Sequence, residues 1–218
     1  MSRIFLALAS FAISLLIGNL ILAFAMGDFG AKSEEYAVAH QTISAARATD
    51  TTTSKELLAH REHLERIGVE LAEQRNRFWP HIWLGIAASL ISLLVNSISI
   101  TYFIGTNRWC REVADAYGMS DEFSDRSAAL KRRSFGWAFI GILLTLAIAG
   151  TGGAADPFSS TAEPASWVVW HWTLGMGGVA LIATSFYAQF TALSANHRVI
   201  QDVLADAARI RAERSVAV

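Results

Sequence analysis

Two histidines occupy matching positions in two similar segments of the chain, and their side chains are well suited to bind a metal. His81 begins the sequence His-Ile-Trp-Leu-Gly, and His171 begins His-Trp-Thr-Leu-Gly. An arginine follows each histidine 27 residues later, at Arg108 and Arg198. Imidazole nitrogens bind haem iron, copper and zinc. If the two histidines lie on adjacent helices, they could be the axial ligands of a haem b, or they could bind a copper or zinc ion with a third ligand supplied by residues 27–79.

A glycine follows each histidine by four residues, at Gly85 and Gly175. One helical turn from the histidines, these glycines would leave space beside a haem. The alternative is that both histidines are polar residues at the membrane interface, where they bond to lipid headgroups or to a loop carbonyl.

A second set of candidate metal ligands precedes the first histidine pair. His60 and His63 would lie one helical turn apart, Glu56 precedes His60 by four residues, and a turn near residue 51 would bring His40 opposite them. Three imidazoles and a carboxylate are a donor set for zinc or iron. The neighbouring charges indicate the alternative, a solvated and ion-paired helix face: Arg61, Glu62, Glu65 and Arg66.

The composition shows which elements must position these residues. Hydrophobic residues make up 53% of the chain and charged residues 17%, and four apolar segments contain no Asp, Glu, Lys or Arg. Each segment could cross about 30 Å of hydrocarbon as a helix. The first could instead be a signal peptide, but its 23 apolar residues exceed the usual run in such peptides, so we expect it to be retained. The segments are residues 4–26, 82–104, 135–155 and 167–193.

We therefore expect an all-α integral membrane protein, a four-helix transmembrane bundle built as two pseudo-repeated helical hairpins. A helix of 27 residues rises roughly 40 Å, which matches a bilayer with its headgroups. The expected transmembrane helices are residues 1–26, 80–106, 135–155 and 167–193. The expected connections are an extracytoplasmic helical hairpin (27–79), a cytoplasmic connection with an amphipathic helix (107–134), a short outer loop (156–166) and a cytoplasmic amphipathic tail (194–218).

The distribution of basic residues predicts the orientation. Residues 107–134 contain six lysines and arginines, whereas residues 156–166 contain none. By the positive-inside rule both termini are then cytoplasmic and residues 27–79 are outside, a pattern typical of a bacterial inner membrane.

Apolar residues at helical spacing predict an antiparallel helical hairpin in the long outer connection. Pro80 would either start the second span afresh or interrupt a helix continuous with the hairpin. The spaced residues are Tyr36, Ala39, Ile43 and Ala46 in one helix and Leu57, His60, Leu64, Ile67, Leu71 and Phe78 in the other.

Two further patterns concern the interior and the cytoplasmic ends. Asn96 and Gln189 belong to helix faces of small and polar residues, which we expect to point toward protein rather than lipid. The glycine-rich residues 150–153 are interpreted as a flexible helix terminus.

Apolar stripes beyond the second and fourth spans could pack on each other or lie on the inner leaflet. The stripe residues are Trp109, Val113 and Tyr117 after the second span, and Ile200, Val203, Ala207 and Ile210 after the fourth.

The sequence contains no motif with a known reaction attached, and its net charge of −1 gives no argument for nucleic-acid binding. It favours a non-catalytic accessory or scaffold subunit in the lipid bilayer. Such a subunit would bind other membrane proteins, or itself, through the outer hairpin and the inner amphipathic helices. The alternatives are a small electron carrier with haem b or a metal at His81 and His171, and a membrane sensor.

Overall fold

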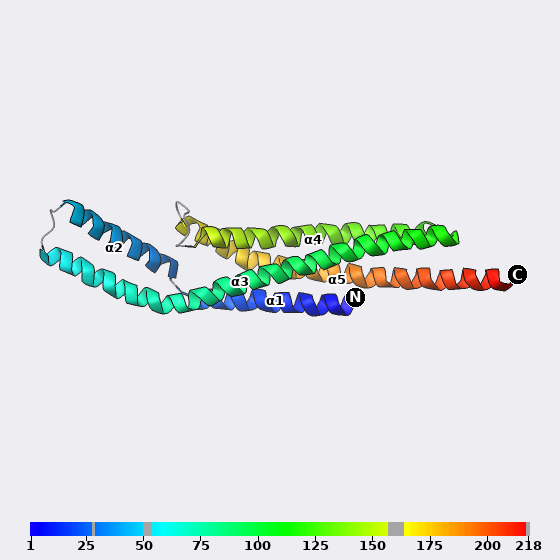
Figure 1. Cartoon of the computed structure of the whole chain (residues 1–218), viewed down its shortest axis with the longest axis horizontal. Coiled ribbons are helices and arrows are strands. Elements are labelled where there is room, and N and C mark those ends of the chain that lie inside the picture. Colours follow the sequence, from blue (N-terminus) through cyan, green and yellow to red (C-terminus); the bar gives the residue numbers. More distant parts are fainter. Residues whose placement is uncertain (28, 50–53, 157–163, 217–218) are drawn as a thin grey trace. The chain divides into compact units, whose positions relative to one another are not determined.

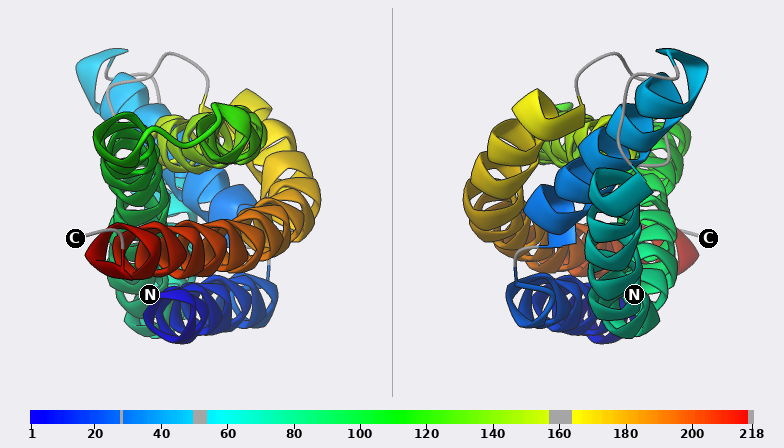
Figure 2. Two further views of the ribbon diagram at one scale, coloured as in Figure 1. Left: turned by 90° about the vertical axis from the view of Figure 1, so that its right-hand side faces the viewer. Right: turned by 90° about the vertical axis from the view of Figure 1, so that its left-hand side faces the viewer.

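The computed structural model describes all residues except 28, 50–53, 157–163 and 217–218 (Figure 1). The described part of the chain is almost entirely helical, and the views in Figure 2 show coiled ribbons without a strand. This confirms the all-α class. The helices are α1 (Ser2–Ala25), α2 (Phe29–Thr49), α3 (Ser54–Tyr117), α4 (Glu122–Ala154) and α5 (Pro164–Val216).

Four segments of these helices are long and apolar enough to cross a membrane. They lie in α1, α3, α4 and α5, with bounds Ser2–Ala25, Phe78–Tyr117, Glu122–Ala154 and Ser166–Val216. This finding indicates an integral membrane protein. All but the first extend beyond the expected spans, because α4 begins in polar sequence before its apolar segment, whereas α3 and α5 continue into polar sequence after theirs.

Helix α3 contains 64 residues and runs through Pro80 without interruption. A proline inside a helix removes one backbone hydrogen bond, and a helix can continue when its surroundings compensate. Pro80 therefore lies within a continuous helix and does not start a new one.

The chain forms two compact units, and α1, α3, α4 and α5 each contribute to both. The first unit contains Met1–Ser14, Ser89–Leu146 and Gly177–Val218. The second contains Leu15–Ala88 and Ala147–Met176.

Buried amide groups join three helices in the first unit. Gln189 on α5 donates from Nε2 to Oδ1 of Asn96 on α3 at 2.9 Å, and both side chains are fully buried. The same Nε2 lies 3.0 Å from Oγ of Ser185, whose hydroxyl donates to the Trp137 carbonyl on α4 at 2.7 Å. Hydrogen bonds of this kind hold helices together in lipid, where no water is available to the polar groups.

Gly141 lets α4 approach this network closely. A Cβ atom at this position would lie 3.0 Å from Oδ1 of Asn96 and 3.1 Å from Oγ of Ser185. Small residues at helix interfaces have this role in membranes, because they permit close backbone approach.

The apolar stripes near the ends of α3 and α5 pack on each other. Cys110 of α3 and Val199 and Val203 of α5 form a buried cluster. Partly buried side chains from α3, α4 and α5 surround it: Trp109, Val113, Phe123, Leu130 and Ile200. Of the two arrangements that the sequence left open, the structure thus shows packing of one stripe on the other.

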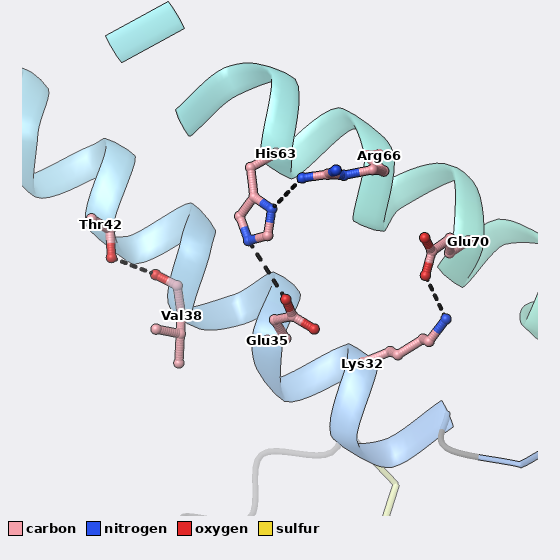
Figure 3. Close-up of polar contacts among 7 residues, drawn as sticks. All are labelled: Lys32, Glu35, Val38, Thr42, His63, Arg66 and Glu70. Carbon is pink, nitrogen blue, oxygen red and sulfur yellow. Dashed lines mark hydrogen bonds and ion pairs between the residues drawn. The ribbon is translucent and has the colours of Figure 1, made fainter. Parts of the chain in front are cut away.

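In the second unit, α2 runs antiparallel to the first part of α3. Lys32 forms an ion pair with Glu70, and Oε1 of Glu35 lies 3.5 Å from Nε2 of His63 (Figure 3). The hydrogen bond and positive charge of Lys32 hold the pKa of the Glu70 carboxyl below its ordinary value. Any stability from this exposed pair is lost as the pH falls through that lowered pKa.

The close approach at Gly141 generates a prediction. Gly141→Ala should lower the free energy of unfolding in detergent by roughly 1–3 kcal/mol, because the added methyl group must displace Asn96 or Ser185. The measurement is an equilibrium unfolding titration followed by circular dichroism. Gly136→Ala is the matched control on the same helix, since a Cβ there meets no atom within 4 Å. Equal stability of the two variants would contradict the prediction.

Candidate functional site

The imidazole rings of His81 and His171 lie next to each other in the second unit. His81 belongs to α3 and His171 to α5, and their ring centroids are 6.2 Å apart with planes inclined by 82°. Both side chains are partly buried. The structure therefore brings together the two histidines that the sequence singled out as candidate ligands.

A backbone carbonyl fixes the tautomer of His81. Nδ1 of His81 lies 3.2 Å from the carbonyl oxygen of Asn19 on α1. Because a carbonyl oxygen can only accept, Nδ1 must carry the hydrogen and donate it. In the neutral ring, Nε2 then holds a free lone pair.

His171 is held in the same way by α4. Its Nδ1 lies 3.2 Å from the carbonyl oxygen of Ile148 and 3.4 Å from Oγ1 of Thr151. The Thr151 hydroxyl donates to the Ala147 carbonyl at 2.8 Å, so its oxygen is left to accept. Nδ1 of His171 is therefore also the protonated nitrogen, and no hydrogen bond to Nε2 of either ring is found in the described part of the chain.

Gly152 on α4 makes room for the His171 ring. A Cβ at Gly152 would lie 2.8 Å from Cε1 of His171 and 3.2 Å from its Nδ1. Residues 150–153 lie in the last turn of α4, which ends at Ala154, so they are at a helix terminus as the sequence indicated. The repeated glycines were the available signal, but the contact with α5 could not be predicted from them.

The glycines expected to flank a haem lie in different surroundings. A Cβ at Gly85 would be 3.1 Å from Nδ2 of Asn19, so an α1 side chain occupies that space. At Gly175, a Cβ would meet no atom within 4 Å.

The described side chains of the second candidate set have different neighbours. His63 contacts Glu35, and its Nδ1 accepts a hydrogen bond from the Arg66 guanidinium at 3.1 Å, whereas His40 lies near the Tyr36 ring. His60 is exposed on α3, and the side chain of Glu56 lies outside the described residues. Where the chain is described, no group of three or more His, Cys, Asp or Glu side chains is placed to hold a metal ion.

The tautomers of the histidine pair can be tested directly. In ¹⁵N-histidine-labelled protein in detergent, His81 and His171 should show the Nδ1–H form, because both donate to carbonyl oxygens. Gly152→Ala should shift the His171 resonances, since its methyl group meets the ring. Gly153→Ala, where a Cβ meets nothing within 4 Å, should leave them unchanged. A predominant Nε2–H form at both residues in the unmodified protein would contradict the assignment.

Comparisons with known proteins give no family for this chain. No family model, curated protein or solved structure was found to match it. Its function therefore has to be inferred from its own residues, chiefly the membrane-spanning helices, the hairpin of α2 and α3, and the pair formed by His81 and His171.

Proposed function

We propose that the chain is a non-catalytic accessory subunit of a membrane assembly and that it binds its partner through the α2–α3 hairpin. The observation that carries this proposal is the continuity of α3, whose 64 residues include both the hairpin helix and a membrane-spanning segment. A partner bound at the hairpin would be attached rigidly to that span.

The packing of the two inner stripes supports the hairpin as the binding surface. Because Trp109, Val113 and Ile200 pack against the buried cluster of Cys110, Val199 and Val203, part of the apolar area of these stripes is already covered. The hairpin, in contrast, exposes large apolar side chains in charged sequence: Val38, Leu58 and Val69. Single exposed apolar residues are common on protein surfaces, but three on one helical pair suit a protein interface.

The proposed orientation places the hairpin outside the cell and both termini in the cytoplasm of a bacterium. Its support is the six basic residues in 107–134, a segment that joins two spans. Exposed tryptophans near the other end of the spans suit the outer interface: Trp79, Trp83, Trp167 and Trp170.

We also propose that the four spans are two related helical hairpins. The anchoring of the histidines supports this relationship. His81 donates to a carbonyl of α1, which contains the preceding span, and His171 donates to a carbonyl of α4, which contains the span before its own. The two matching sequence segments thus make the same type of contact.

The histidine pair favours a second candidate function, a metal-binding protein of the membrane. A sensor has the weaker support, because the continuity of α3 is explained equally well by partner binding.

Cysteine labelling in intact bacterial cells tests the orientation. Val69→Cys should react with a membrane-impermeant maleimide, whereas Val216→Cys should react only after the membrane is permeabilised. Both positions are exposed, while the native Cys110 is fully buried and provides the unlabelled background. Labelling of Val216→Cys alone in intact cells would reverse the proposed orientation.

Site-specific photo-crosslinking tests the partner surface. A photoreactive amino acid at Val38, Leu58 or Val69 should give one adduct of the same mass in native membranes, because all three would face the same partner. Leu90 and Leu143, which are exposed on span segments, are the controls and should not give it. Mass spectrometry would then identify the partner as another protein or a second copy of this chain. If no hairpin position gives a discrete adduct, the proposed function is wrong.

A further inference from the structure

We propose that His81 and His171 bind one copper(I) ion between their Nε2 atoms. This site is separate from the partner-binding role of the hairpin, which involves other residues and requires no metal.

Backbone carbonyl groups hold both imidazole rings in the tautomer that leaves Nε2 able to bind a metal. Each Nδ1–H donates to a carbonyl oxygen at 3.2 Å, from Asn19 in one case and Ile148 in the other. Metal-binding histidines characteristically donate their second ring N–H in this way, which fixes the ring and strengthens the other nitrogen as a ligand. Both Nε2 lone pairs are therefore available to an ion.

The separation of the rings agrees with a single bridging ion. With metal–nitrogen bonds of about 2.0–2.1 Å, as imidazoles make to zinc, two rings whose Nε2 atoms face one ion from opposite sides have centroids roughly 6.3 Å apart. The observed distance is 6.2 Å. The 82° angle between the ring planes is compatible with a linear ion, because rotation of either ring about its metal–nitrogen bond leaves the coordination unchanged.

The number and charge of the donors favour copper(I). Structural zinc takes four ligands, whereas copper(I) is stable with two nitrogen ligands in a line. No third His, Cys, Asp or Glu joins the pair within the described ranges. The groups that anchor the rings are neutral carbonyls and the Thr151 hydroxyl. A monovalent ion also costs less to bury beside neutral groups than a divalent one.

A side chain and a stretch of backbone occupy part of the space that a haem would need, while the space beside Gly175 is open. Asn19 lies against Gly85, and the α4 backbone at Gly152 lies against the His171 ring. A bare ion needs only the space between the two rings, whereas a macrocycle would extend outward toward these groups.

The test is a copper(I) titration of the full-length protein in detergent, under reducing conditions, against a chromogenic copper(I) chelator. The unmodified protein should bind one ion per chain. His81→Ala and His171→Ala should each weaken binding at least about tenfold, because a single imidazole remains. The control is His197→Ala, which removes an exposed histidine from α5 and should bind as the unmodified protein does.

A measurement on the unmodified protein keeps the test independent of variant folding. X-ray absorption of the copper-loaded protein should show the edge feature of two-coordinate copper(I) and scattering from two imidazoles. Binding no tighter than that of the double variant His81→Ala/His171→Ala would overturn the proposal. Three- or four-coordinate copper would also overturn it. A Soret band in the purified protein that both single variants lose would overturn it as well, because it would assign the pair to haem.

Photo-crosslinking from Val69 should be unchanged in the histidine variants. Failure of the copper site is therefore distinguishable from failure of the hairpin's role.

Discussion

The buried amide contact between Asn96 and Gln189 is the interaction on which the packing of the first unit depends. In hydrocarbon, a side-chain amide has no water to bond with, so its hydrogen bonds must come from neighbouring helices. Gln189 satisfies its donors with Asn96 and Ser185, and Ser185 continues the connection to α4. This chain of donors and acceptors sets which faces of α3, α4 and α5 meet, and the absence of a side chain at Gly141 sets how closely they meet.

The same constraint acts on the histidines in the second unit, with a different result. Their Nδ1–H groups use backbone carbonyls of α1 and α4 as acceptors, so the need to satisfy one nitrogen of each ring determines the state of the other. Each hydrogen bond joins two helices, and each leaves the Nε2 atom of its ring with a lone pair. The hydrogen bond at Nδ1 and the unused lone pair at Nε2 thus follow from one arrangement.

Helical periodicity explains how much of this could be predicted from the sequence. The polar face of the second span contains His81 and Asn96, and its spacing shows that both should face other helices. The contacts themselves could not be predicted, since they depend on which residues of α1 and α4 lie opposite. Gly85 looked like space for a cofactor and instead accommodates Asn19, while Gly152 received no site role and contacts His171. In the hairpin, helical spacing predicted neither the ion pair of Lys32 with Glu70 nor the contact of His63 with Glu35.

The passage of α3 through Pro80 also constrains how the chain length can vary. Because successive residues of a helix are rotated by about 100°, inserting one residue before the span would turn every preceding side chain of that helix by about that angle relative to the following ones. Seven residues make nearly two full turns and would almost restore the original direction. Length changes in residues 54–77 should therefore be tolerated in steps of roughly seven.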